Sequence, residues 1–313
     1  SLEDARKNKF LLNGSATSVK PSFIGNKALK NYPLEEIAKF IDWTPFFHSW
    51  EMKGTYPKIF DNKERGAEAK NLFDDAQKML KKIIDGKWLQ ANAVIGFYPA
   101  YSENDDIVLG QTKNGVVFHT IRQQTKKPSG QFNISLSDFV KPQNDFIGAF
   151  AVTTGIGIEK KLAEFAKDHD DYSSIMLKAL ADRLAEAFAE HLHARVRKEF
   201  WGYAKEENLT SEEIIQEKYQ GIRPAHGYSA QPDHTEKKIL FDLLEAEKNT
   251  GITLTESMAM YPTAAVCGLY FSHPDSHYFG VGKIRKDQVE DYAKRKRMKL
   301  EEVEKWVGPI FAY

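Results

Sequence analysis

The residues best suited to bind a ligand lie in one short stretch, GIRPAHGYSAQPDHTEK, at residues 221–237. Arg223 offers a planar guanidinium, which pairs with carboxylates through two parallel hydrogen bonds. Gly227 lets a ligand approach the backbone closely, and Tyr228 supplies an aromatic ring. The same residue types also build ordinary loops, in which Arg223 would simply pair with Glu217. Composition alone leaves both interpretations open.

Three more side chains have chemistry that a binding site could use. Glu186 is flanked by alanines on a predicted helix, and a carboxylate on a buried face must find a partner or stay protonated. Asp42 could cap a turn or meet a cationic ligand. His234 falls in the first turn of a predicted helix, where the helix dipole disfavours its charged form. For Glu186 and Asp42, structural and binding roles both stay open.

The common catalytic and metal-binding motifs are absent from the sequence. Gly155 and Gly157 stand between a predicted strand and helix, but the third glycine and the acidic residue of a dinucleotide-binding fingerprint are missing. Walker A, G-x-S-x-G and H-E-x-x-H patterns are missing as well. His191 and His193 point about 200° apart on a predicted helix and cannot share a metal. We therefore expect no catalytic side chain and no metal site.

Composition limits the classes of partner. Lys and Arg together number 44, as do Asp and Glu, so the chain is neutral and no charge draws it to nucleic acid. No run approaches the roughly 20 apolar residues that cross a membrane. The single cysteine, Cys267, excludes an internal disulfide and suits a cytoplasmic protein. The chain begins SLEDARKNKF, without a signal-peptide pattern, and we expect it to be a fragment of a longer protein.

The elements that position these residues come in blocks of helices and strands, which favours an α+β fold. Residues 1–33 are polar and rich in turn-forming residues, so we expect an extended arm or linker, followed by one domain over residues 34–313. Helical spacing of apolar residues predicts a long helix over residues 172–200, buried on two sides. Asp233 and Glu236 predict a capping box at the start of another helix. Predicted strands are AVIGFYP, DDIVLG, VVFHTIR and FIGAFAVTT, with a C-terminal hairpin in AAVCGLYFSHPDSHYFGVGKI.

Six motifs follow one another along the chain: IDWTPFF, ADRLAEAFAEHLHARVRKEFWGYA, RPAHGY, PDHTEK, LTESMAM and YFSHPDSHYFGVGKI. In this order and spacing they resemble the C-terminal activation domain of cobalamin-dependent methionine synthase, and the likeness runs from about Leu2 to Tyr313. The resemblance implies a bent, mainly antiparallel sheet flanked by helices, and not the Rossmann methyltransferase fold. It also implies that the chain binds S-adenosylmethionine.

The resemblance further implies a methyltransferase function in reductive reactivation. The methyl group of S-adenosylmethionine restores methylcobalamin from cob(II)alamin, with an electron from flavodoxin or a related flavoprotein. Cobalamin is held by a separate domain of the same enzyme, so that domain and the flavoprotein are the expected partners. The chain alone is expected to be inert.

The resemblance assigns roles by motif position. Arg223 is implied to hold the methionine carboxylate, and Asp42 to face the ammonium group. Tyr278 and Phe279 are implied to contact the adenosyl part, and His234 lies in the segment that faces cobalamin. The other implied S-adenosylmethionine-binding residues are Glu186, Ala225, Gly227 and Tyr228, with Glu217 in the pocket wall.

Two departures and two alternatives accompany this interpretation. His226 and Ser229 stand where the family has proline, which predicts a less rigid loop. The cobalamin-binding motif D-x-H-x-x-G is absent. The alternatives are a docking module for flavodoxin and the cobalamin domain with a degraded pocket, and a free-standing methyltransferase with an unrelated acceptor.

Overall fold

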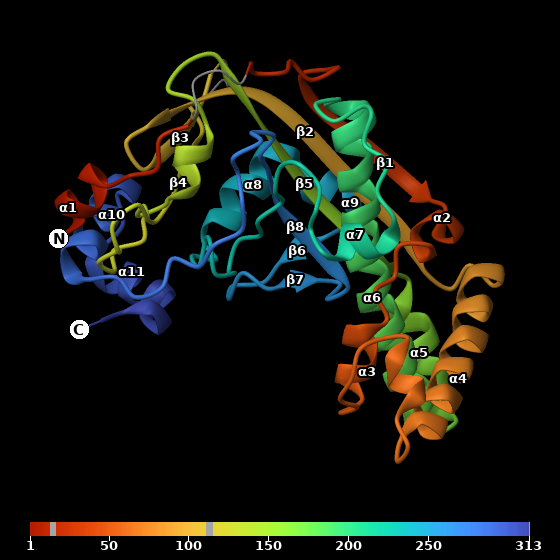
Figure 1. Ribbon diagram of the computed structural model, residues 1–313. Coiled ribbons are helices and arrows are strands. Elements are labelled where there is room, and N and C mark those ends of the chain that lie inside the picture. Colours follow the sequence, from red (N-terminus) through yellow and green to blue (C-terminus); the bar gives the residue numbers. More distant parts are fainter. Residues whose placement is uncertain (13–16, 111–114, 313) are drawn as a thin grey trace.

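The computed structural model describes residues 1–12, 17–110 and 115–312. Residues 13–16 of the expected arm, and residues 111–114 and 313 of the expected domain, lie outside this described part. Helices and strands are both abundant, so the predicted α+β class is confirmed (Figure 1). None of the helices within the described ranges combines the length and apolar character that crossing a membrane requires.

The strands form one large sheet and one short pair. The strands are β1 (Gly25–Tyr32), β2 (Gln90–Glu103), β3 (Asp106–Leu109), β4 (Val117–His119), β5 (Asp145–Ile156), β6 (Thr253–Leu254), β7 (Met260–Tyr261) and β8 (Ala265–Tyr270). The α-helices are α1 (Leu2–Lys7), α2 (Leu34–Ala38), α3 (Thr44–Ser49), α4 (Gly66–Asp85), α5 (Ile158–Lys167), α6 (Asp171–Arg195), α7 (Ser211–Ile215), α8 (Glu236–Leu244), α9 (Ala246–Thr250), α10 (Lys286–Lys296) and α11 (Leu300–Val307). Short 3-10 turns lie at Lys58–Asp61, Leu136–Phe139 and Gly308–Ile310.

Strand β2 organises the large sheet. One of its edges pairs with β5, from Gln90 opposite Ile156 to Ala100 opposite Asp145. The other edge is divided between β1 and β3. The strand order is β4-β3-β2-β5-β8, and every ladder between the described strands is antiparallel. In Figure 1 β2 arches over the other elements, so the sheet is bent, as the sequence analysis predicts.

The central strands are buried on both faces because side chains alternate along a strand. On β5, Phe150 and Val152 join the core that α6 covers. Ile147, Ala149 and Ala151 point the other way, into the core that α8 covers. Two buried faces explain why FIGAFAVTT is almost continuously apolar instead of alternating.

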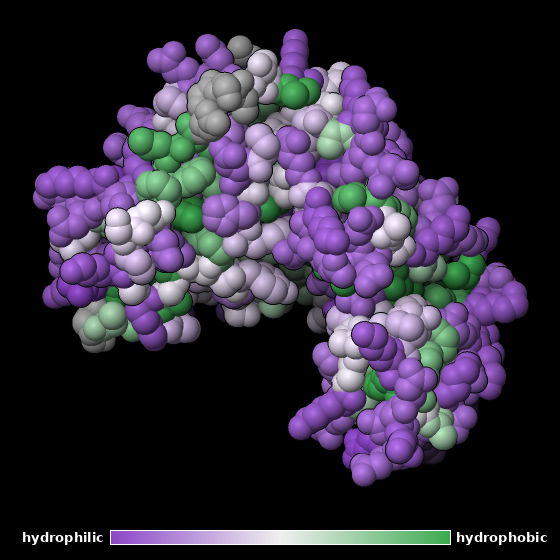
Figure 2. Space-filling view, in the orientation of Figure 1, coloured by the Kyte–Doolittle hydropathy of each residue, from purple (hydrophilic) through white to green (hydrophobic). Residues whose placement is uncertain are grey.

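Two groups of helices lie at opposite ends of the sheet. In Figure 1, α3, α4 and α5 gather near α6 at one end, and α1, α10 and α11 gather at the other, where both termini lie. Figure 2 shows the hollow between these two ends and a largely hydrophilic surface. The molecule is therefore an arch, with the sheet as its middle part.

The predicted long helix is present. Its first turn is capped by Asp170, whose carboxylate accepts a hydrogen bond from the Ser173 amide at 2.9 Å. The helix continues from α6 into a π-helical turn at Val196–Phe200. Phe188 on one side and His193 on the other are both fully buried, so burial on two sides is confirmed.

The N-terminal arm is more structured than expected. Residues 25–32 form β1, which pairs with β2, and Leu2 and Ala5 of α1 are buried. Most of β1 is exposed, and its sequence GNKALKNY has little apolar alternation. Exposed lysines are typical of an edge strand, and the strand is defined by its pairing with β2 instead of by its own pattern.

The predicted C-terminal hairpin is wrong in its second strand. β8 forms, but its free edge pairs with residues 222–224: the Phe271 amide donates to the Ile222 carbonyl and the Leu269 amide to the Pro224 carbonyl, both at 3.0 Å. Because this edge is already occupied, residues 276–283 have no regular secondary structure.

The predicted capping box is also wrong. Asp233 accepts from the Thr235 amide at 2.8 Å, and α8 begins only at Glu236. The Glu236 carboxylate does not turn back to Asp233; it accepts from the His119 amide at 2.9 Å and from Lys296 Nζ at 2.6 Å. A contact with α10, far along the chain, replaces the local one.

Candidate functional site

Three segments of the chain meet beside β8: the middle of α6, residues 217–230, and residues 278–279. The pairing of residues 222–224 with β8 fixes the second of these segments. Gly268 in β8 permits this close approach, because a Cβ atom there would lie 2.4 Å from the Pro224 carbonyl oxygen. The edge of the sheet therefore holds the loop that carries Arg223.

These segments enclose a pocket of about 210 Å³. The residues of the predicted site that line it are Glu186, Glu217, Arg223, Ala225, Tyr228, Tyr278 and Phe279. The pocket is also lined by residues that the sequence analysis did not assign to it: Pro224, Ser229, Ala230 and Val266. Residues almost 100 positions apart in the sequence are thus brought together in one site.

Arg223 is held from two directions. Its Nη2 donates to Glu190 Oε2 at 3.0 Å, and its backbone amide donates to the Tyr278 hydroxyl at 3.0 Å. Its buried Nε has no hydrogen-bond partner among the described residues. Burial opposes the charge of Arg223, but the Glu190 carboxylate and the neighbouring tyrosines raise its pKa above the usual value. Arg223 is therefore a charged, positioned donor at the pocket wall.

Two carboxylates line the same pocket. Glu186 comes from α6, and Glu217 follows α7 with a left-handed backbone, φ 55°. Burial raises the pKa of Glu217, although Arg223 acts in the opposite direction. The expected alternative, an ion pair between Arg223 and Glu217, is not formed; Arg223 pairs with Glu190. The pocket thus offers one guanidinium and two carboxylates.

The aromatic pair lies where the sequence analysis expects it, although no second strand carries it. Tyr278 shares a hydrogen bond with the Tyr219 hydroxyl at 3.3 Å in addition to its bond with Arg223. Burial raises the pKa of Tyr278, so its hydroxyl stays protonated at neutral pH. Phe279 packs edge-to-face on Phe139, with 6.0 Å between ring centroids. Both rings are fixed by neighbours outside the pocket.

Gly227 and His234 do not line this pocket. They line a neighbouring one of about 540 Å³, which shares Tyr228 and Ser229 with the first. Gly227 has φ 91°, and a Cβ atom there would lie 2.1 Å from the His234 ring, so only glycine fits beside that ring.

His234 is held in its neutral form, as expected, but for another reason. Burial and the nearby Lys237 ammonium lower its pKa, and the residue lies just before α8 and not in its first turn. Lys237 Nζ lies 3.0 Å from Nδ1 of His234. An ammonium group can only donate, so Nδ1 accepts and the proton of the neutral ring sits on Nε2.

Asp42 is not among the residues that line the pocket around Arg223. Its carboxylate accepts a hydrogen bond from the Thr44 amide at 2.9 Å, at the start of α3. The bond spans two residues and stabilises the turn that leads into α3, whose N-cap position is occupied by Trp43, so it resembles the structural one of the two alternatives that the sequence left open. A contact with a ligand's ammonium group stays a prediction.

His226, which stands where a proline was expected, is a packing residue. It is 2% exposed and its ring stacks on Phe118, with centroids 6.0 Å apart. Burial lowers its pKa to about 3, so it is neutral at physiological pH. The loop is anchored nearby by the Val281 amide, which donates to the Ser229 carbonyl at 2.8 Å.

Glu190 is the residue that the sequence analysis missed. It lies one helical turn after Glu186 on α6, and this spacing of four residues is the signal that could have revealed it.

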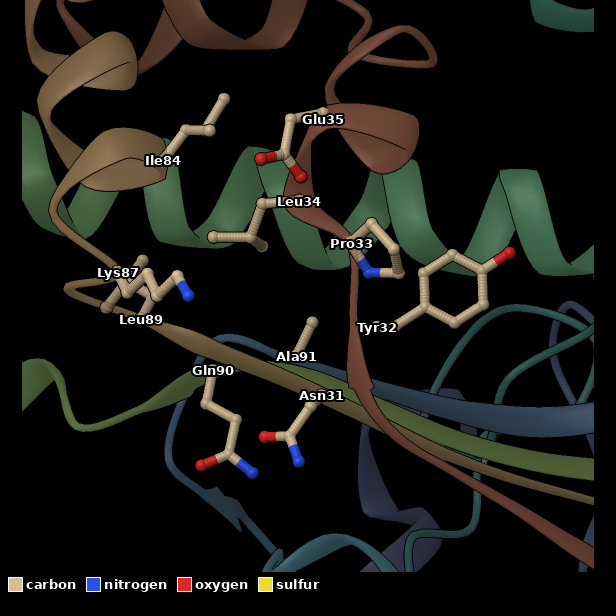
Figure 3. A pocket seen from close by; sticks show the side chains of 10 residues that line it. All are labelled: Asn31, Tyr32, Pro33, Leu34, Glu35, Ile84, Lys87, Leu89, Gln90 and Ala91. Atoms are coloured by element: carbon tan, nitrogen blue, oxygen red, sulfur yellow. The ribbon is translucent and has the colours of Figure 1, made fainter.

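A further pocket of about 380 Å³ lies between the end of β1, the start of α2 and the loop after α4. Figure 3 shows Glu35 and Lys87 on separate elements, with Leu34 and Ile84 between them and no convergent set of charged groups. None of the predicted site residues lies there. Among the described residues, no cluster of three or more His, Cys, Asp or Glu side chains could hold a metal ion.

Comparisons with known proteins agree with this description. Residues 33–297 match the family described as vitamin B12 dependent methionine synthase, activation domain. The chain is also similar to a solved structure described as the crystal structure of the MetH reactivation domain bound to AdoHcy, with 49% sequence identity and a TM-score of 0.96. The match covers 100% of this chain and 98% of the other. The predicted fold, unlike a Rossmann methyltransferase, is thereby confirmed.

Proposed function

We propose that this chain, which belongs to the family of vitamin B12 dependent methionine synthase activation domains, binds S-adenosylmethionine in the pocket around Arg223. The similar solved structure is described as bound to AdoHcy, the product that remains when S-adenosylmethionine loses its methyl group. The observation that carries the proposal is the buried Nε of Arg223, which has no partner within the described ranges and belongs to a residue lining this pocket.

The charges of the pocket match the methionine end of S-adenosylmethionine. Its carboxylate needs a charged donor, which Arg223 supplies. Its ammonium and sulfonium groups are both cationic, and the Glu186 and Glu217 carboxylates can stabilise them. One guanidinium and two carboxylates thus complement one anionic and two cationic groups.

The size of the pocket indicates which part of the ligand it takes. A volume of about 210 Å³ is smaller than the roughly 300–1,000 Å³ of a typical ligand pocket. The methionine end fits inside, and the adenosyl part extends along Tyr228, Tyr278 and Phe279. The backbone beside Ala225 is close enough to the pocket to contact the ligand, and Gly227 supports this loop from its other side.

Asp42 can join this site in one way. Its carboxylate has a second oxygen beyond the one that accepts from the Thr44 amide, and that oxygen can accept from the ligand's ammonium group. The bond with Thr44 would then orient the carboxylate toward the ligand.

We further propose that the bound donor is presented to cobalamin on a separate domain, with an electron from flavodoxin or a related flavoprotein. Cobalamin supplies the nucleophile for the methyl group. The pocket that His234 lines adjoins the donor pocket through Tyr228 and Ser229, which makes it the part of this chain where we expect cobalamin to approach the donor. The chain's own task is to hold the donor's charges and to orient its methyl group, because an in-line displacement needs no general base.

A degraded pocket, as in a pure docking module, is disfavoured because the charged and aromatic groups are all present and held by neighbours. A cytoplasmic location stays a prediction from the single, buried Cys267.

Isothermal titration calorimetry of the isolated chain tests the proposal. We expect saturable one-to-one binding of S-adenosylmethionine and of S-adenosylhomocysteine, and much weaker binding of adenosine, which lacks the methionine end. Absence of saturable binding for both full-length ligands contradicts the proposal. Affinity for adenosine equal to that for S-adenosylmethionine also contradicts it, because the Arg223 contact would then contribute nothing.

A further inference from the structure

A stripe of largely buried charged side chains runs from the Arg223 pocket along α6 and into the π-helical turn that follows this helix. Glu186, Glu190 and Arg197 lie on it at spacings of four and seven residues, which place them on one side of a helix. Glu186 lines the pocket, and the other two lie farther along the stripe, toward the π-helical turn. Arg197 lies within this turn, and π-helical turns are frequent at functional sites.

Glu190 lies between two guanidinium groups. Its Oε2 accepts from Arg223 Nη2 at 3.0 Å. Its Oε1 lies 3.8 Å from Arg197 Nη1, an ion-pair distance without a hydrogen bond, and both of these atoms are buried and accept or donate no other bond among the described residues. The Glu190 side chain is only 15% exposed, and that of Arg197 is fully buried. Arg197 is fixed in turn by three hydrogen bonds that its Nε and Nη2 donate to the Glu207 carboxylate, at 2.8 to 3.0 Å, and by the Tyr219 ring, 4.3 Å from its guanidinium carbon.

This arrangement decides which edge of Arg223 is free. A carboxylate that faces a single arginine commonly binds both Nε and Nη2. Here one oxygen of Glu190 is turned toward Arg197, so Glu190 bonds to Arg223 through Nη2 alone. The Nε of Arg223 consequently has no partner in the described part of the chain.

We infer that Glu190, held between Arg223 and Arg197, is a positioning residue that keeps the Nε edge of Arg223 available for the carboxylate of the ligand. The inference rests on the proposed function, because it assumes a ligand with a carboxylate in this pocket. Arg197 acts one step farther away, by preventing Glu190 from closing over Arg223.

The test compares two ligands that differ only in the carboxylate: S-adenosylmethionine and its decarboxylated analogue. Calorimetry of the Glu190→Ala variant should show an affinity for S-adenosylmethionine about tenfold weaker than that of the original chain, with affinity for the analogue unchanged. Glu190→Gln keeps one acceptor oxygen. It should therefore recover at least half of the lost affinity for S-adenosylmethionine, when affinity is compared on a logarithmic scale. Glu199→Ala is the matched control, because Glu199 lies on the π-helical turn but is 55% exposed and pairs with Arg195.

A second variant keeps the test independent of the stability of Glu190→Ala. Replacing Arg197 and Glu207 together by glutamine removes one buried cation with its partner anion, so no unpaired charge is left between them. Glu190 can then close over Arg223, and affinity for S-adenosylmethionine, but not for the analogue, should fall.

The outcomes separate the inference from the proposed function. Equal losses for both ligands would mean that Glu190 only maintains the fold, and unchanged affinities would mean that it has no role; either result overturns the inference. Failure of the original chain to bind S-adenosylmethionine overturns the proposed function as well.

Discussion

Replacing Arg223 by methionine removes the one guanidinium that we assign to the ligand and keeps a side chain of similar length. Hydrogen bonds to charged groups contribute about 1.5–3 kcal/mol. At 1.4 kcal/mol for each factor of ten, the dissociation constant for S-adenosylmethionine should rise by roughly 10- to 150-fold. The lower end applies if water takes over part of the contact with the carboxylate.

The same substitution also affects stability, because Glu190 loses its closer partner. A buried carboxylate left without any cation costs about 3–5 kcal/mol, but Arg197 remains 3.8 Å away. We therefore expect a smaller loss, about 1–3 kcal/mol, seen as a decrease in Tm of several degrees. Thermal unfolding with and without ligand separates this effect from binding, provided that titrations are made well below Tm.

Calorimetry with three variants is the assay. Arg223→Lys retains the charge without the planar fork and should bind with intermediate affinity. Arg195→Met is the control, because Arg195 lies at the end of α6, does not line the pocket, is 28% exposed and pairs with Glu199. If Arg223→Met binds S-adenosylmethionine within threefold of the original chain, the assignment of Arg223 to the carboxylate is refuted.

Two further predictions concern stability and reactivity away from the pocket. Lys296 Nζ bonds to Asp233 and Glu236, all three nearly fully buried, so Lys296→Met should lower the free energy of unfolding by about 3–5 kcal/mol at pH 7, measured by urea denaturation. These carboxylates outweigh burial and raise the pKa of Lys296, so its contribution is complete below the unfolded pKa of about 10.4 and is lost as pH rises through the folded value. Burial raises the pKa of Glu236, whereas Lys296 and Thr235 outweigh burial and lower that of Asp233. The deficit of the variant should therefore narrow on acidification, as Glu236 and then Asp233 become protonated, and a deficit that grows on acidification would contradict this account. Burial raises the pKa of Cys267 to about 12, so a thiol reagent at pH 8 should label it only at the rate of unfolding; immediate labelling of the native chain would contradict its burial.

The sequence was sufficient to predict those helices and strands whose own apolar residues are spaced as their buried faces require. The long helix α6 and the doubly buried β5 follow from apolar spacing that tertiary contacts do not change. The pocket around Arg223 was expected because the resemblance implied which distant segments meet, and the structure brings seven of the named residues to one place, whereas Asp42 and Gly227 do not line that pocket.

The missed features depend on contacts between residues far apart in sequence. β1 is a strand only because β2 lies beside it, and residues 276–283 do not form one because the loop before Arg223 already occupies the β8 edge. Glu236 bonds to Lys296, 60 positions away, instead of capping its own helix. Neither apolar periodicity nor local capping patterns show that a distant segment will take the place of a local hydrogen-bond partner.

Glu190 illustrates the same limit within the site. Its position on α6 follows from spacing, but its choice of Arg223 over any nearer cation requires the folded loop. The sequence offered Glu217 as a partner because it is close in the chain, but in the folded pocket both residues line the wall and Arg223 forms its ion pair with Glu190.

A crystal structure of this chain with S-adenosylmethionine tests the central claim most directly. We predict that the methionine carboxylate lies within hydrogen-bond distance of Arg223 Nε, with Glu190 still bonded to Nη2 and the ammonium and sulfonium groups facing Glu186 and Glu217. Ligand density in the neighbouring pocket beside His234, with Arg223 Nε making no contact to the carboxylate, would contradict the claim.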